Sequence, residues 1–178
     1  MGQPKALLKL GEYTFLENIL RAIAQSSVSH TAVVLGHHRE AIERTVPLNN
    51  AIFNPDYESG MITSIKAGIF SLPQGSDGAL LFLVDHPVID VATINELIRR
   101  FEAGRIILPT YQGRRGHPVL FAREVLDEIL ALPISVGANI VVRRDPSRVI
   151  EVAVTDRGVI LDVDTPEQFE ELRRGDVS

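Results

Sequence analysis

Residues 78–90 read GALLFLVDHPVID, and this stretch indicates the fold class. Every residue from Ala79 to Val84 is apolar, which is typical of a strand buried on both faces of a parallel sheet. Pro87 cannot continue such a strand in a sheet interior, because it lacks the backbone N–H that the ladder needs. The strand is therefore expected to stop abruptly, with Asp85 at its carboxyl end.

Similar apolar runs alternate with helical patterns along almost the whole chain. Strand-like runs occupy residues 31–36, 51–54, 105–111, 117–122, 149–154 and 158–163. Helical patterns occupy residues 14–26, 38–46, 60–72, 90–104, 123–132, 137–145 and 165–175. This alternation predicts an α/β fold: a three-layer, mainly parallel Rossmann-like sheet with helices on both faces.

Three of the helical patterns begin with capping signals. Thr14 followed by Glu17, and Thr165 followed by Gln168, have the spacing of a capping box, in which each side chain bonds a backbone amide at the start of the helix. Asp90 is the expected N-cap of the pattern at 90–104. These signals fix where the helices are expected to start.

The composition narrows the class of protein. A length of 178 residues predicts a single domain, and the absence of cysteine excludes a disulfide framework, a zinc–thiolate site and a cysteine nucleophile. Acidic residues number 23 against 18 basic ones, which argues against nucleic acid as a partner. The chain has no apolar run of about 18 residues and no signal-peptide pattern, so no membrane association and a cytoplasmic location are expected.

Ligands of open α/β sheets bind beyond the carboxyl ends of the strands, so Asp85 is the first candidate site residue. A carboxylate in that position suits a hard divalent cation that is shared with substrate phosphates. The alternative is a structural aspartate, since Asp is common in turns. His86 is expected to be exposed or packed, and is not expected to be a ligand.

A pair of carboxylates lies at the end of the apolar run at 158–163. Asp162 and Asp164 are two residues apart and share one face of an extended segment, where they repel each other unless a cation or donor lies between them. A metal satisfies this requirement. Alternatively, Asp164 bonds the first amides of the following helix beside Thr165.

Two further stretches could contact a substrate. In YQGRRGHPVLF, residues 111–121, Arg114 and Arg115 offer forked donors to phosphate, and Gly116 and His117 follow them. The commoner meaning of such a run is a solvated hairpin turn. In NPDYESGMITSIKAG, residues 54–68, Gly60 and Ser64 open a helix whose first amides can hold an anion or polar ring atoms.

Five stretches taken in order resemble one family, the molybdenum cofactor nucleotidyltransferases, and most closely their cytidylyltransferase branch. They are MGQPKALLKLG (1–11), SGMITSIKAGI (59–69), LLFLVDHPVID (80–90), YQGRRGHPVLF (111–121) and LDVDTPEQFEEL (161–172). The resemblance implies the nucleotide-diphospho-sugar transferase-like fold. It also implies magnesium-dependent transfer of CMP from CTP to the phosphate of molybdopterin, with pyrophosphate released. A molybdoenzyme or a chaperone is the protein partner it implies.

The resemblance also assigns roles to individual residues. Lys5 and Asp85 are implied as catalytic, with Lys5 on the triphosphate. Asp85 and Asp164 are implied as magnesium ligands, and the role of Asp162 stays open. Gly60 and Ser64 are implied as nucleotide-binding. The acceptor is expected at Arg114, Arg115, Gly116 and His117.

The sequence departs from the family pattern in three places. Val84 stands where a glycine is usual, and Asn139 stands where an arginine is usual. Met1 and Gly2 match the end of the family's first motif, so residues 1–178 are expected to be a single domain without the family's first strand and glycine-rich loop. Two alternatives stay open: a nucleotidyltransferase with another phosphorylated acceptor, and a non-catalytic module that binds the molybdenum cofactor.

Overall fold

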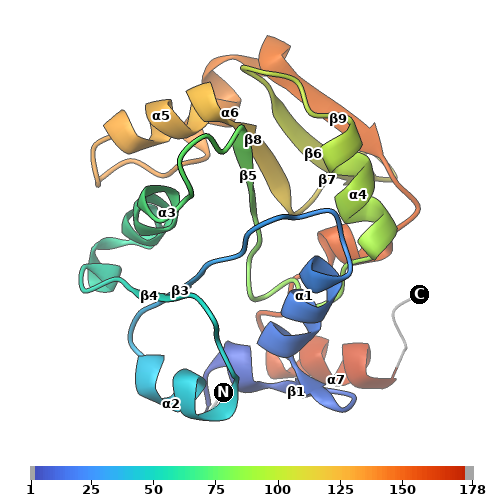
Figure 1. The fold of residues 1–178 in the computed structure, drawn as a ribbon. Helices are drawn as coiled ribbons and strands as arrows, with labels where there is room; N and C mark the ends of the chain where they lie inside the picture. Colours follow the sequence, from blue (N-terminus) through green and yellow to red (C-terminus); the bar gives the residue numbers. More distant parts are fainter. Residues whose placement is uncertain (1–2, 175–178) are drawn as a thin grey trace.

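The protein, described by a computed structural model over residues 3–174, is built of alternating helices and strands (Figure 1). The helices are α1 (Phe15–Ala24), α2 (Arg39–Thr45), α3 (Met61–Phe70), α4 (Val91–Arg99), α5 (Arg123–Ala131), α6 (Ile140–Arg144) and α7 (Pro166–Arg174). The strands are β1 (Lys9–Leu10), β2 (Tyr13–Thr14), β3 (Val33–Leu35), β4 (Ala51–Phe53), β5 (Gly78–Leu81), β6 (Ile106–Tyr111), β7 (Arg114–Arg115), β8 (Val119–Ala122) and β9 (Val149–Ala153). Short 3-10 helices cover Lys5–Leu7, Tyr57–Ser59, Pro146–Arg148 and Arg157–Ile160.

The larger sheet has five strands and is centred on β6. Its strand order is β5-β8-β6-β7, and β9 also pairs with β6. β9 runs parallel to β6, whereas β8 runs antiparallel to both β5 and β6. The sheet is therefore mixed, because the chain returns from β6 through a tight hairpin and pairs back onto it.

Helices cover both faces of this sheet. On one face, Ile106 and Leu108 of β6 share a core cluster with buried residues of α3, α5 and α6. On the other face, Ile107 packs with Leu97 of α4 and with Val152 of β9. The side chains of β6 alternate between the two clusters, as the period of two along a strand requires. The predicted α/β class, with helices on both faces, is confirmed (Figure 1).

The remaining strands form separate small sheets. β3 and β4 run parallel, with Val33 opposite Ala51 and Leu35 opposite Phe53, and β1 and β2 form a hairpin. Within residues 3–174, β3 pairs with β4 alone and β5 pairs with β8 alone. The β3–β4 sheet is thus not joined to the larger sheet that contains β5. Among the described residues, β3 and β5 each have one edge outside any ladder.

The predicted strand at residues 158–163 is wrong. Its first part is the 3-10 helix Arg157–Ile160, and the residues after it are extended without a ladder partner in the described chain. The cause is Asp156, which is buried and accepts hydrogen bonds from the amides of Gly158 (2.8 Å) and Asp90 (2.9 Å). An aspartate that bonds the amide two residues on favours a turn over a strand.

Side-chain capping bonds are present at two of the three helices with predicted caps. The boxes Thr14–Glu17 and Thr165–Gln168 are present, with reciprocal side-chain and backbone bonds of 2.8–3.2 Å. Asp90 is the N-cap residue of α4, as expected, but its side chain makes no capping bond. The neighbouring Asp156 carboxylate instead raises the pKa of Asp90 by repulsion.

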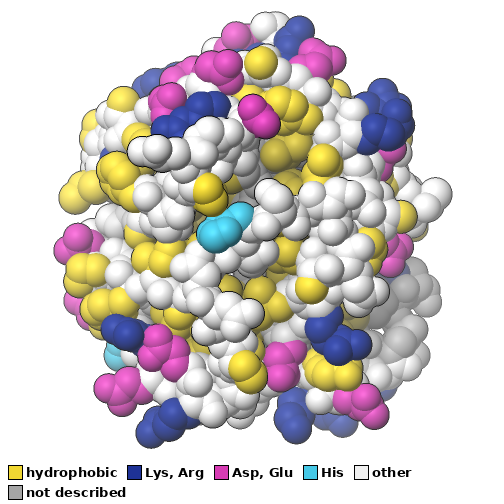
Figure 2. Space-filling model, viewed as in Figure 1, with side chains coloured by type: hydrophobic (Ala, Val, Ile, Leu, Met, Phe, Trp, Pro, Cys, Tyr) yellow, Lys and Arg dark blue, Asp and Glu magenta, His cyan; other side chains and the backbone are white. Residues whose placement is uncertain are grey.

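The surface carries both signs of charge. On the face shown in Figure 2, basic and acidic side chains are interspersed with apolar ones rather than gathered into one basic area. Within the part of the chain that the structure describes, no helix combines the length and apolar character needed to cross a bilayer.

Candidate active site

Asp85 lies in a turn beyond the end of β5. The ladder of β5 ends at Leu81, so the strand is shorter than the apolar run, and Asp85 follows its carboxyl end by four residues. The amide of His86 donates to the carbonyl of Leu83 (3.1 Å), and the carbonyl of Asp85 accepts from the amide of Val163 (2.9 Å). The second bond ties the turn that carries Asp85 to the segment just before α7.

The same segment brings Asp164 to the N-terminal part of the chain. Val163 is 2% exposed and packs in one cluster with Leu8 and Phe15. With Val163 buried, Asp164 faces solvent, and its Oδ1 accepts a hydrogen bond from Lys5 Nζ at 2.5 Å. Residues 5, 85 and 164, far apart in the sequence, are thereby gathered at one edge of the fold.

The Lys5–Asp164 pair bears on the interpretation of Asp164 as a helix cap. The carboxylate binds Lys5, whereas the helix cap is made by Thr165 and Gln168. Asp164 contributes only its amide, which donates to Gln168 Oε1 at 2.8 Å. The structural alternative, in which Asp164 caps α7, is therefore excluded. Asp162 is also exposed. The two aspartates flank the buried Val163, so exposed and buried side chains alternate along this segment.

The Asp85 carboxyl is held in its charged form. A hydrogen bond from His86, with Nδ1 3.0 Å from Oδ1, lowers the pKa of Asp85, partial burial opposes this, and the charge of Lys5 lowers the pKa further. Lys5 is thus close enough to act on both carboxylates. An ionised carboxylate beside a lysine is the kind of site that binds a divalent cation or a phosphate.

His117 lies against His86 on the other side of the turn. The two ring centroids are 5.0 Å apart, and the amide of His117 donates to the carbonyl of Val159 at 2.8 Å. Burial lowers the pKa of His117, and the nearby His86 lowers it further. Its Nδ1 is buried and has no hydrogen-bond partner among the described residues. Both influences favour the neutral form of this imidazole.

The two arginines of the predicted acceptor loop lie on an exposed strand. Arg114 and Arg115 form the exposed strand β7, after a turn with positive φ at Gln112 and Gly113. Arg115 donates from Nε and Nη2 to Glu151 Oε1, at 2.8 and 2.6 Å. Of the four predicted acceptor residues, His117 is the one whose ring reaches the neighbourhood of Asp85, and the arginines follow the geometry of a solvated hairpin.

Gly116 is required by a close backbone approach. A Cβ built on Gly116 would lie 2.2 Å from the carbonyl oxygen of Val159 and 2.7 Å from its carbon, and backbone atoms cannot move aside as a flexible side chain can. We expect Gly116→Ala to destabilise the protein by about 1–3 kcal/mol, as overpacking does. Thermal unfolding measures this, with Gly113→Ala as control: that position has open space but a φ of +78°, so it costs only backbone strain. Equal melting temperatures for Gly116→Ala and the wild type would contradict the packing assignment.

Gly60 and Ser64 open α3 beside a buried asparagine. Gly60 is the N-cap residue, with a φ of 107° that disfavours any side chain. Asn54, only 3% exposed, donates from Nδ2 to Ser64 Oγ (3.0 Å) and to Thr63 Oγ1 (2.8 Å). Asn54 therefore joins the end of β4 to the first turn of α3. In the sequence, the only indication of this role is that Asn54 directly precedes Pro55.

Two carboxylates are available to a metal at this edge. Within residues 3–174 no cluster of three or more histidine, aspartate or glutamate side chains has the spacing of a metal site. Asp85 and Asp164, both near Lys5, are hard oxygen donors of the kind that magnesium and manganese prefer. Such a pair fits a cation that takes its other ligands from water and substrate phosphates.

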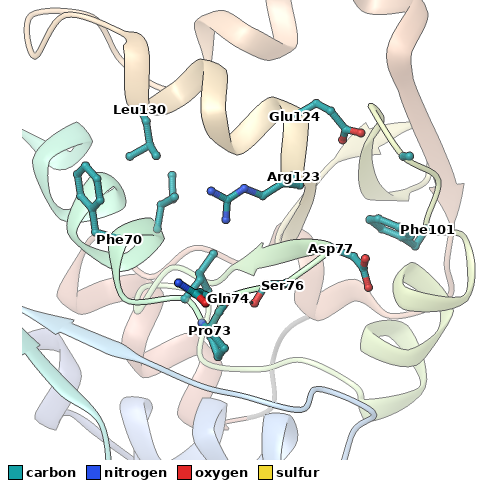
Figure 3. Close-up of a pocket in the computed structure, with 13 residues that line it drawn as sticks. Phe70, Pro73, Gln74, Ser76, Asp77, Phe101, Arg123, Glu124 and Leu130 are labelled. Carbon is teal, nitrogen blue, oxygen red and sulfur yellow. Dashed lines mark hydrogen bonds between the residues drawn. The ribbon is translucent and has the colours of Figure 1, made fainter.

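A cavity lies away from these residues. It has a volume of about 560 Å³ and is bordered by the end of α3, the start of α5 and the residues before β5. Figure 3 shows Arg123 reaching into it between Leu130 and Asp77. Asp77 directly precedes β5, whereas Asp85 follows it, so cavity and carboxylates are at opposite ends of one strand.

Comparison with known proteins shows the family to which the chain belongs. Residues 1–149 match the family model described as "MobA-like NTP transferase domain". The chain is 28% identical over 175 residues to the molybdenum cofactor cytidylyltransferase of Escherichia coli K12, covering 95% of this chain and 86% of that protein. The crystal structure of Rv0371c from Mycobacterium tuberculosis H37Rv superposes with a TM-score of 0.87 at 27% identity, covering 98% of this chain and 90% of that one. A manganese complex of Rv0371c superposes with a TM-score of 0.85 at 26% identity, covering 97% and 93%.

Proposed function

Because the chain belongs to the MobA-like NTP transferase family, we propose that it transfers CMP from CTP to the phosphate of molybdopterin and releases pyrophosphate. The observation that carries this proposal is the meeting of Lys5, Asp85 and Asp164 at one edge of the fold. The choice of CTP and molybdopterin is supported by the likeness to the Escherichia coli cytidylyltransferase.

The reaction needs no protein nucleophile. An oxygen of the acceptor phosphate attacks the α-phosphorus of CTP, a new P–O–P bond forms, and the bond to the leaving pyrophosphate breaks. Such reactions depend on positioning and on compensating the charge of the phosphates. Lys5 supplies a fixed positive charge to the triphosphate, and a magnesium ion held by Asp85 and Asp164 would offset further negative charge there. Gly60 and Ser64, at the start of α3, would contact the nucleotide.

Without substrate, Lys5 and Asp164 form an ion pair, with Nζ 2.5 Å from Oδ1. If Asp164 held a cation, Lys5 would be free to bind the triphosphate, so the two residues would be used together. The exposed fractions of their side chains, 31% and 59%, allow both to reach a ligand from solvent.

Asp164→Asn is expected to weaken cation-dependent nucleotide binding by about tenfold or more, the usual range for losing a group that supports a metal. The free energy of unfolding should change by less than about 1 kcal/mol, because exposed ion pairs contribute little. Calorimetry with magnesium and CTP, together with thermal unfolding, checks both values. Asp162→Asn is the matched control, since it removes an exposed carboxylate two residues away. Equal affinities for the two variants would contradict the role of Asp164.

A different phosphorylated acceptor is the second candidate. Arg115 is engaged by Glu151, so it does not offer a free guanidinium to the acceptor. Molybdopterin and a set of sugar and alditol phosphates, each tested for acceptor-dependent pyrophosphate release from CTP, separate these substrates. If CTP is bound but no acceptor supports turnover, a cofactor-binding module without catalysis is favoured.

We also propose that a further strand and a glycine-rich loop, preceding Met1 in a longer form of the protein, belong to this domain. The support is the interruption between β3 and β5, each of which has one edge outside any ladder among residues 3–174. Two strand edges outside a ladder are what an inserted strand would pair with. The loop after it would supply backbone amides to the triphosphate.

A further inference from the structure

The side chain of His86 contacts the carboxylate of Asp85, which the sequence did not predict. Its Nδ1 lies 3.0 Å from Asp85 Oδ1, and the side chains are 15% and 29% exposed. An ionised carboxylate can only accept a hydrogen bond, so the imidazole Nδ1 must carry the proton in this pair. His86 is therefore a donor to the residue that the proposed function assigns to the cation.

The ring of His86 is fixed by its surroundings. It borders a small recess together with His117 and five apolar or proline residues: Phe82, Leu83, Val88, Ile89 and Pro118. The ring of His117 packs against it with an interplanar angle of 57°. The amide of His86 is also bonded to Leu83 in the turn. Both the backbone and the ring of His86 are thus restrained, whereas the Asp85 carboxylate has only this one side-chain partner in the described chain.

We propose that His86 is a positioning residue, which holds one oxygen of the Asp85 carboxylate and leaves the other oriented for a divalent cation. The inference rests on the proposed function, because it takes Asp85 as the cation ligand. A free carboxylate rotates broadly about its last torsion. A hydrogen bond from a restrained ring narrows this rotation before the cation arrives. Supporting bonds of this kind change metal affinity by about 10–100-fold.

Two substitutions separate the hydrogen bond from packing. His86→Phe keeps a ring of similar size in the recess and removes the donor. His86→Asn removes the ring but keeps a donor nitrogen attached to Cγ, as Nδ1 is in histidine. The EPR signal of free Mn²⁺, followed while protein is added, measures cation affinity without turnover. We expect about 10–100-fold weaker binding for His86→Phe and less than about threefold for His86→Asn. His38→Ala removes an exposed histidine and is the control.

The outcomes distinguish this proposal from the proposed function. If Asp85→Asn weakens Mn²⁺ binding but His86→Phe does not, the positioning role is wrong and Asp85 remains the ligand. If the Phe and Asn variants lose affinity equally, packing and not the hydrogen bond is responsible, and the proposal is overturned. If Asp85→Asn binds Mn²⁺ as the wild type does, the cation is elsewhere and both proposals fail. Should His86→Phe not fold, His86→Leu serves as the second variant without a donor.

Discussion

Asp85→Asn is expected to reduce cation-dependent nucleotidyl transfer by about 10²–10³-fold, the range seen when one stabilising group is removed from a charged transition state. The substitution keeps the shape of the side chain and its acceptor oxygen but removes the negative charge. Its fold should be intact, because the backbone carbonyl of residue 85 still accepts from Val163. The measurement is the rate of pyrophosphate release from CTP over a range of magnesium concentrations.

A matched control is available at the other end of β5. Asp77 directly precedes β5 and is exposed, whereas Asp85 follows it. Asp77→Asn changes the net charge equally and should leave the rate unaltered. Raised magnesium should recover part of the activity of Asp85→Asn if weak cation binding causes the loss. Full activity of Asp85→Asn at low magnesium would contradict the assignment of Asp85.

The second large effect is expected from an N-terminal extension. A form that adds the residues encoded in frame upstream of Met1 should bind magnesium and CTP at least tenfold more tightly than residues 1–178, a difference of about 1.4 kcal/mol. Hydrogen bonds to charged groups contribute roughly 1.5–3 kcal/mol each, so a few loop amides on the triphosphate would suffice. Lys5 alone cannot replace them, because an ammonium on a flexible stem lacks the fixed geometry of a backbone cradle.

Calorimetry on the two forms tests this expectation. The control is the extended form with a proline placed in the middle of the added strand, since proline removes a ladder hydrogen bond and should prevent insertion between β3 and β5. The shorter form should also self-associate more, because strand edges outside a ladder pair with other chains. Equal affinity of the short and extended forms would show that residues 1–178 already contain a complete nucleotide site.

The fold class could be predicted because it depends on local patterns. The apolar run before Asp85 and the alternation of strands and helices reflect burial on both faces of a sheet. Capping boxes at Thr14 and Thr165 depend on residues three positions apart, so they were visible in the sequence. The mixed pairing of the larger sheet was not visible, because it is decided by how the β6–β7 hairpin returns onto β6.

Parts of the site could not be predicted because they depend on contacts distant in the sequence. The run at 158–163 has the composition of a strand, but the Asp156 carboxylate bonds Gly158 and Asp90 and turns the chain instead. Lys5 and Asp164 are 159 positions apart in the sequence. Only the family resemblance assigned the two residues to one site. His86 adjoins Asp85 in the sequence, yet the sequence does not show that its ring turns back onto that carboxylate.

Nucleotidyl transfer is tested most directly by a single-turnover experiment with the protein in excess over CTP labelled at the α-phosphate. The label should move from CTP to molybdopterin when magnesium and molybdopterin are both present, and unlabelled pyrophosphate should appear in equal amount. The excess of protein over labelled CTP reveals the transfer even where binding is weak. The proposed reaction would be contradicted if the label stayed in CTP with molybdopterin and with every other phosphorylated acceptor. The same result would have to be obtained with the extended form of the protein.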